Sequence, residues 1–227
     1  MIKAIVTDIE GTTGSIHFVH QVLFPYAKQH LPEFVRQQQA QPAVAEQVAA
    51  VKAEMQKPDA DLDAVIAQLI TWIEADQKIT PLKALQGLIW DTGYKTGAYK
   101  GHVYDDAHQQ LQAWREQGLA LYIYSSGSVY AQKLLFGFSE FGDLTPWFTG
   151  YFDTQVGGKR EAQSYQAIVQ QIGLAAEEIL FLSDVVEELD AAQQVGIKTV
   201  QLVREPNMVV GEHTQVASFK EIDLSAI

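Results

Sequence analysis

The chain has 227 residues, of which 47% are hydrophobic, and it carries 28 acidic side chains against 16 Lys and Arg, a formal net charge of −12. This composition suits a globular protein, and its charge repels phosphate backbones, so we expect no nucleic-acid partner. The absence of cysteine excludes disulfides, thiolate nucleophiles and cysteine-based zinc sites. No apolar run approaches the roughly 20 residues that span a bilayer. Lys3 and Asp8 also interrupt any N-terminal apolar stretch, so we expect a cytoplasmic protein with no membrane partner.

The first stretch with chemical character is Asp8-Ile9-Glu10-Gly11-Thr12-Thr13, which follows a short apolar run at residues 2–6. The run predicts a buried strand, and its end is where an open α/β sheet usually binds ligands. Asp8 and Glu10 are two residues apart, so extended backbone points both side chains to the same side. Two carboxylates, a glycine and neighbouring hydroxyls suit a hard cation such as Mg²⁺ and an anionic ligand. An ordinary acidic turn after a strand would give the same local pattern.

Residues 18–99 have the pattern of helices, with little strand character. Residues 61–76 predict an amphipathic helix, whereas Pro32 interrupts an earlier helical pattern. His17 and His20 have no third nitrogen ligand spaced nearby, so we assign them to the start of this block rather than to a zinc site. Three aromatic residues are interpreted as core: Trp72, Trp90 and Tyr94.

From residue 103 onward, short apolar strands alternate with helices of 10–15 residues, a pattern typical of a parallel sheet covered on both faces. The first strand, at residues 2–7, has no parallel partner inside the helical block, which we therefore interpret as an insertion that can act as a lid. The sequence thus predicts an α/β fold, a Rossmann-like parallel sheet with helices on both faces formed by residues 1–16 and 101–227, and an inserted helical cap formed by residues 17–100. The later strands are predicted at residues 119–124, 151–152, 178–182 and 198–203.

Polar side chains follow these later strands. Ser125 and Ser126 stand where a strand meets a helix, a position that favours an anion site, whereas Ser128 is better explained as the helix cap. Lys159 lies in a glycine-containing loop, where it could supply positive charge to a phosphate site or could be an ordinary exposed lysine.

A further acid, Asp184, stands directly after the strand at residues 178–182 and Ser183. Glu188, in the next helical turn, is attributed to a favourable interaction with the helix dipole. Because the carboxyl ends of parallel strands meet at one edge, we expect Asp184 to join the earlier acids, the serines and the lysine there. Carboxylates, paired serines and one lysine are the groups of a metal-assisted phosphoryl-transfer site.

The order of these groups resembles the four motifs of the haloacid dehalogenase-like phosphohydrolases, and the resemblance covers essentially the whole chain. The motifs occur as Asp8-Ile9-Glu10-Gly11-Thr12, Ser125, Lys159 and Ser183-Asp184. Glu10 stands where most phosphatases of that family have aspartate. This departure, together with Thr12-Thr13 and Tyr124-Ser125-Ser126-Gly127-Ser128, is similar to the enolase-phosphatases of methionine salvage.

The resemblance implies a role for each matched residue. Asp8 would be the nucleophile that forms an aspartyl-phosphate, and the side chain of Glu10 would be the general acid–base candidate. One Mg²⁺ per subunit would be bound by Asp8, Asp184 and residue 10, through either its carbonyl or its side chain. The substrate-binding residues would be Ser125, Ser126 and Lys159, of which the lysine also balances charge during catalysis.

The resemblance further implies a small phosphorylated diketone as substrate, 2,3-diketo-5-methylthiopentyl-1-phosphate. It would be enolised and then dephosphorylated to the acireductone 1,2-dihydroxy-3-keto-5-methylthiopentene, and we expect the enzyme to be a monomer. The base for the enolisation stays open between Glu10 and a cap residue, and the cap residues that contact the methylthio end are not defined. Three alternatives remain: a phosphatase for another small phosphomonoester, a metal-free dehalogenase, and a non-catalytic binding protein that kept the fold.

Overall fold

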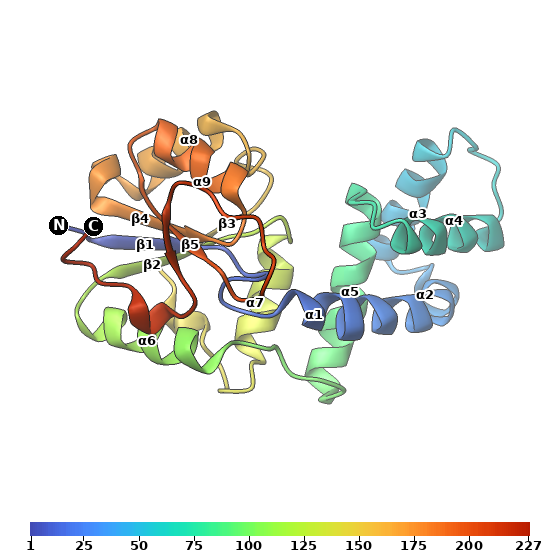
Figure 1. Cartoon of the computed structure of the whole chain (residues 1–227). Coiled ribbons are helices and arrows are strands. Elements are labelled where there is room, and N and C mark those ends of the chain that lie inside the picture. The colour runs from blue at the N-terminus through green and yellow to red at the C-terminus, as the bar shows by residue number, and fades with distance from the viewer. The chain divides into compact units, whose positions relative to one another are not determined.

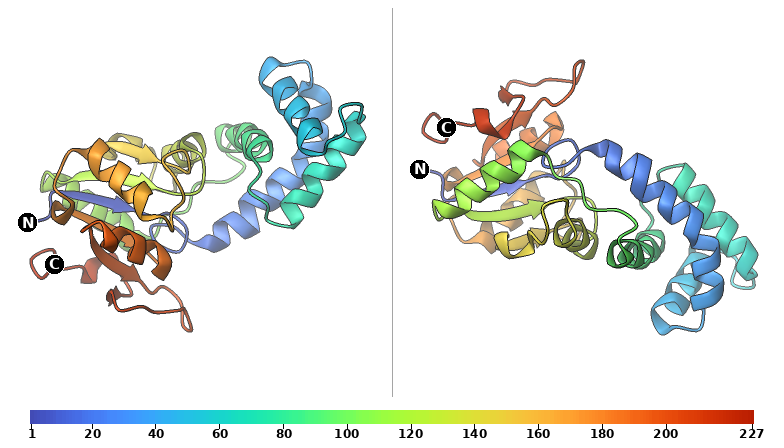
Figure 2. Two further views of the ribbon diagram at one scale, coloured as in Figure 1. Left: turned by 90° about the horizontal axis from the view of Figure 1, so that it is seen from above. Right: turned by 90° about the horizontal axis from the view of Figure 1, so that it is seen from below.

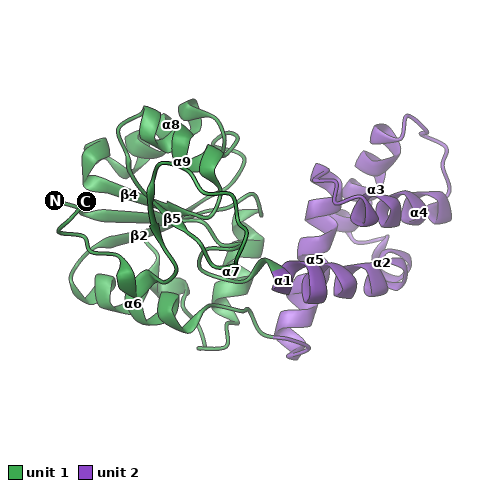
Figure 3. Cartoon of the chain, in the orientation of Figure 1, with its two compact units in different colours: residues 1–16, 100–227 green, residues 17–99 purple.

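The computed structural model describes residues 1–227 and divides the chain into two compact units (Figure 3). The core unit consists of residues 1–16 and 100–227, and the helical unit consists of residues 17–99.

The core unit is built on a six-stranded parallel sheet with the strand order β3-β2-β1-β4-β5-β6. All four residues of the central strand β1 are buried, as expected for a strand covered on both faces. Thr7, at the end of β1, is in register with Ile123 of β2 and Leu182 of β4. The residues that follow these three strands are therefore neighbours at one edge of the sheet. The strands are β1 Ala4–Thr7, β2 Ala120–Tyr124, β3 Gly150–Phe152, β4 Ile179–Ser183, β5 Lys198–Leu202 and β6 Thr214–Val216.

Helices cover both faces of this sheet, with α6 and α7 on one face and α8 and α9 on the other (Figures 1 and 2). The predicted α/β class, with a Rossmann-like parallel sheet, is confirmed. The helices of the core unit are α6 Asp105–Glu116, α7 Val129–Gly137, α8 Ala162–Ile172 and α9 Val186–Gln194, with short 3-10 segments η2 Thr145–Trp147, η3 Ala176–Glu178 and η4 Phe219–Glu221.

The last strand, β6, is an element that the sequence does not predict. Of its three residues only Val216 is buried, because β6 is short and lies at the edge of the sheet. So short a strand with one buried residue shows no alternation of apolar and polar residues in the sequence from which it could be predicted.

The helical unit has its own hydrophobic core, in which Leu31, Leu69 and Leu85 are completely buried. α4 confirms the predicted amphipathic helix: it buries one apolar face, and Asp61 caps it by accepting the Ala64 N–H at 2.8 Å. α2 continues through Pro32, which costs one helical hydrogen bond rather than ending the helix. The elements are α1 Ile16–Phe18, a π-helical turn η1 Val19–Leu23, α2 Phe24–Gln38, α3 Pro42–Glu54, α4 Leu62–Glu74 and α5 Thr80–Thr96.

Of the three aromatic residues that we assigned to the core, two are buried and one is half-buried. Trp72 and Tyr94 are buried. Trp90 is half-buried, and its indole N–H donates to the carbonyl of Leu23 at 2.8 Å. None of the helices combines the length and the apolar composition that crossing a membrane requires.

Candidate active site

Asp8 directly follows β1 and is buried, with 2% of its surface exposed. Its backbone is held on both sides, because its N–H donates to Leu182 at 2.9 Å and its carbonyl accepts from the Thr13 hydroxyl at 2.9 Å. Gly11 adopts a positive φ of 73°, and its N–H closes the loop by donating to the carbonyl of Gly14 at 2.8 Å. The first acidic motif is thus a tight loop that fixes the position of the Asp8 carboxylate.

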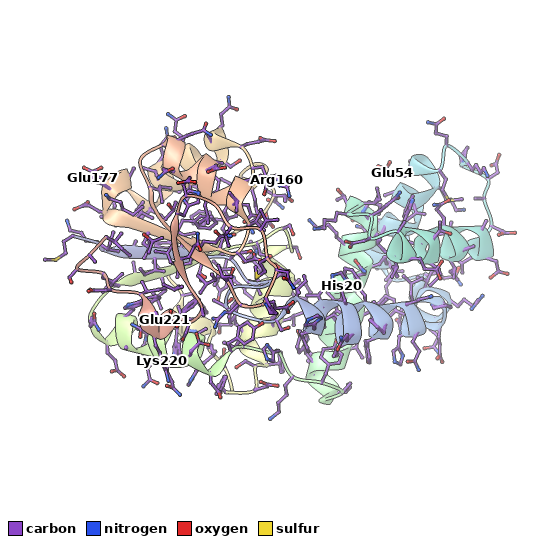
Figure 4. All side chains as sticks on the ribbon, in the orientation of Figure 1. His20, Glu54, Arg160, Glu177, Lys220 and Glu221 are labelled. Carbon is purple, nitrogen blue, oxygen red and sulfur yellow. The ribbon has the colours of Figure 1, made fainter.

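Lys159 reaches this carboxylate from the loop between β3 and α8, where Figure 4 labels the following residue, Arg160. Its ammonium nitrogen lies 2.5 Å from Asp8 Oδ1 and 2.8 Å from Glu188 Oε2, and its side chain is only 9% exposed. Burial by itself lowers the pKa of Lys159. The two carboxylates raise this pKa by more than burial lowers it, so the ammonium group stays charged. The alternative of an ordinary exposed lysine is therefore wrong.

Glu188 is the site residue that the sequence interpretation missed. It stands in the first turn of α9, but its side chain is buried, accepts from the Ser183 hydroxyl at 2.9 Å and pairs with Lys159. Its assignment to the helix dipole alone is wrong. The available signal was its spacing, because a residue one helical turn after Asp184 can turn back toward the end of β4.

Asp184 follows β4 and lies against the loop of the first motif, because a Cβ atom added at Gly11 would overlap its Oδ2 atom. Its other oxygen, Oδ1, is buried and has no hydrogen-bond partner. Burial raises the pKa of Asp184 to about 6, and the nearby Glu188 adds to the effect. A buried carboxylate oxygen without a donor carries a desolvation cost that a bound cation would remove.

Glu10, after β1, and Ser125, after β2, are joined by a hydrogen bond at the same edge of the sheet. The Ser125 hydroxyl donates to Glu10 Oε2 at 3.2 Å and accepts the N–H of Gly127 at 3.1 Å. Ser126, the next residue, is half-buried. Ser128 caps α7 by accepting the N–H of Ala131 at 3.2 Å, as predicted.

The site as a whole carries more negative than positive charge. Burial raises the pKa of Asp8 well above its usual value; Lys159 opposes this rise, and Glu188, Glu10 and Asp184 reinforce it. A hard divalent cation fits such a site, because it would offset the excess charge and give Asp184 Oδ1 a partner. No three acidic, His or Cys side chains form a complete metal site by themselves. The side chains would therefore supply part of a ligand set that backbone oxygen, water or substrate completes.

A buried carboxylate follows the central strand, a lysine lies beside it, and further acids follow the adjacent strand; this arrangement suits hydrolysis through a carboxylate nucleophile. Residues 2–196 also match the family model described as haloacid dehalogenase-like hydrolase. The fold recurs in a solved dehalogenase that is 21% identical, with a TM-score of 0.58 and coverage of 97% of this chain and 95% of that one.

More similar proteins narrow the assignment. Enolase-phosphatase E1 of Pseudomonas savastanoi pv. phaseolicola is 60% identical over 98% of this chain and 97% of its own length. The protein of the same name from Pectobacterium carotovorum subsp. carotovorum is 55% identical over 99% and 98%. The crystal structure of the UTR4 protein of Saccharomyces cerevisiae is 35% identical, covers 98% of this chain and 100% of that one, and has a TM-score of 0.83. The chain belongs to the haloacid dehalogenase-like hydrolases and, within them, to the enolase-phosphatase E1 family, which confirms the resemblance found in the sequence.

Proposed function

We propose that the protein is a Mg²⁺-dependent enolase-phosphatase of methionine salvage. It converts 2,3-diketo-5-methylthiopentyl-1-phosphate to the acireductone 1,2-dihydroxy-3-keto-5-methylthiopentene and phosphate. The choice of substrate rests on the relatives named enolase-phosphatase E1. The observation that carries the phosphoryl-transfer chemistry is the buried ammonium group of Lys159, 2.5 Å from Asp8 and 2.8 Å from Glu188. An anion-binding lysine joined to a buried carboxylate suits transfer of a phosphoryl group to that carboxylate.

In the dephosphorylation step, the Asp8 carboxylate attacks phosphorus, and the bond from phosphorus to the substrate oxygen breaks as the aspartyl-phosphate forms. Water then hydrolyses this intermediate, releasing phosphate and restoring Asp8. Lys159 orients the carboxylate and offsets charge on the phosphoryl oxygens. Ser125 and Ser126 bind those oxygens.

Glu10 is the proton-transfer group of the proposal. Its carboxylate already accepts the Ser125 hydroxyl at 3.2 Å, which places it beside the phosphoryl-binding serines. There it can donate a proton to the departing substrate oxygen and take one from the attacking water.

The residues that would hold one Mg²⁺ are Asp8, Asp184 and Glu10. Support comes from the all-oxygen character of this set and from the buried, unpartnered Oδ1 atom of Asp184. When bound, the cation supplies positive charge that polarises the diketone and stabilises the phosphoryl group. We further propose that residues 17–100 form the cap domain and that the enzyme is a monomer that acts in the cytoplasm.

The experiment follows enol absorbance and free phosphate together, with the diketo phosphate as substrate, in Mg²⁺ and in excess EDTA. We expect the enol signal to precede phosphate release, and both to vanish in EDTA. Comparable cleavage of simple sugar phosphates would favour the phosphatase without enolase activity. Phosphate release that survives the chelator would contradict the metal, and no turnover of any phosphoester would favour a binding protein.

A further inference from the structure

Three consecutive backbone carbonyls in the Lys159 loop each accept a hydrogen bond from a side-chain hydroxyl. Tyr124 donates to Gly157 at 3.0 Å, Ser164 donates to Gly158 at 2.8 Å, and Tyr165 donates to Lys159 at 2.7 Å. We refer to the donors Tyr124, Ser164 and Tyr165 as the hydroxyl clamp.

The clamp residues come from two elements that flank the loop. Tyr124 is the last residue of β2, and Ser164 and Tyr165 are in the first turn of α8. All three are buried, at 0%, 1% and 1% exposure respectively. Burial raises the pKa of Tyr124 to about 12, so its hydroxyl keeps the proton that it donates. The Gly158 carbonyl also accepts the Glu161 N–H at 3.1 Å, whereas carbonyls in a loop otherwise depend on side chains or water for their donors.

The loop packs closely against the first turn of α8 at Gly157. Gly157 adopts a φ of 132°, which strains any other residue, and a Cβ atom there would overlap the Ser164 hydroxyl. The Tyr124 ring also lies beside the ammonium group that the loop carries, with its centroid 5.8 Å from Lys159 Nζ. The backbone of Lys159 is thus held in place at one end of the residue, while the ammonium group at the other end contacts Asp8 and Glu188.

We propose that the hydroxyl clamp is a positioning device for Lys159, in which Tyr124, Ser164 and Tyr165 hold the loop so that the ammonium group reaches Asp8 and Glu188. A lysine side chain has several rotatable bonds, so a fixed backbone limits where its nitrogen can lie. A displacement of about 1 Å at a reacting group can cost up to roughly 10²-fold in rate. The inference rests on the proposed role of Lys159 in dephosphorylation.

The test uses Tyr124→Phe and Tyr165→Phe, which each remove one oxygen and keep the ring, and Ser164→Ala as an independent third variant. Tyr151→Phe is the matched control, because the Tyr151 hydroxyl also donates to a backbone carbonyl, that of Thr145 at 3.4 Å, but lies on the edge strand β3. Phosphate release from the diketo phosphate gives kcat and KM. Acylation of Lys159 by an amine-directed reagent, measured by mass spectrometry against the exposed Lys133 in the same sample, reports whether Lys159 has left its buried position.

We expect Tyr165→Phe to lower kcat by about tenfold, because the free energy of one lost hydrogen bond corresponds to a rate change on this order. KM should change by less than about threefold. Acylation of Lys159 should rise relative to Lys133, while Tyr151→Phe changes neither quantity. Wild-type kcat and wild-type acylation in all three clamp variants would overturn the proposal. So would an equal rise in acylation at Lys159 and Lys133, which would show general loosening of the fold.

Lys159→Ala is measured in parallel and separates this inference from the proposed function. If Lys159→Ala released phosphate at the wild-type rate while the clamp variants still exposed Lys159, the role of the lysine would be wrong and the clamp would stand. If Lys159→Ala lost activity while the clamp variants behaved as wild type, the clamp would be wrong and the role of the lysine would stand.

Discussion

At the scale of single residues, the site depends on one buried cation shared by two buried carboxylates. Lys159 is the only ammonium group bonded to Asp8, and it also pairs with Glu188. A buried charge that loses its partner is strongly destabilising, by about 3–5 kcal/mol. The charge balance of the candidate site and the folding stability therefore depend on the same side chain.

Lys159→Ala should lower kcat for phosphate release by about 10²–10³-fold, the usual cost of removing one electrostatic group at a reacting centre. It should also lower the melting temperature, because Asp8 and Glu188 remain buried without a counter-charge. Assays well below the new melting temperature separate the two effects, and Lys133→Ala, at an exposed position on α7, is the control. Turnover within twofold of wild type would contradict the assigned role.

The residues at the site could be predicted to different degrees. Asp8 and Asp184 were predictable because each follows an apolar strand, and parallel strands end at one edge. The burial of Lys159 was not, since glycine-containing loops usually expose lysine, and only the fold shows that this loop returns to Asp8. Glu188 was attributed to the helix dipole because sequence alone does not show which way a first-turn side chain points.

At the scale of elements, Arg204, which follows β5, links the loop of the first acidic motif to α6. Its guanidinium donates twice to the carbonyl of Thr12, at 2.9 and 3.2 Å, and pairs with Asp106 Oδ2 at 2.8 Å. Asp106 Oδ2 also accepts from the Phe219 N–H at 2.7 Å and from the Ser218 hydroxyl at 2.9 Å. One partly buried ion pair thus joins the first motif, α6 and the C-terminal segment.

This network predicts a pH-dependent stability. Burial raises the pKa of Asp106, but the Phe219 N–H and Arg204 together lower it more, so its pKa lies below the usual value of about 3.9. A lowered carboxyl pKa contributes stability that is fully present above the unfolded-state value and is lost as the pH falls through the folded-state value. Asp106→Asn should therefore lower the free energy of unfolding by about 1.5–3 kcal/mol at pH 7, and by progressively less below about pH 4.

Denaturant unfolding at several pH values measures this difference, with the neighbouring exposed Asp105→Asn as the control. A difference between wild type and Asp106→Asn that is the same at pH 3 and pH 7 would rule out the ionic network as its source.

At the scale of the whole molecule, the alternation of strands and helices was sufficient to predict the parallel sheet. β6 and the π-helical turn at Val19–Leu23 were not predictable, because neither carries a hydrophobic period of its own.

The helical unit should fold by itself, because every residue of its buried core lies within residues 17–99. A fragment of these residues should show a helical circular dichroism spectrum and a cooperative thermal transition. Leu69→Ala, at a fully buried position, should lower its stability by about 2–5 kcal/mol. A broad, non-cooperative melt of the unsubstituted fragment would show that its core depends on the rest of the chain.

The most direct test of the central claim, that Asp8 is the nucleophile, is Asp8→Asn supplied with the diketo phosphate and Mg²⁺. An amide keeps the shape of the carboxylate but is a far weaker nucleophile, whereas enolisation needs only a polarised carbonyl and a base. We expect enol absorbance to rise, at a reduced rate, while free phosphate stays at background. Phosphate release near the wild-type rate would contradict it. Absence of both signals in a variant that still binds Mg²⁺ would show that Asp8 is also required for the proton transfer.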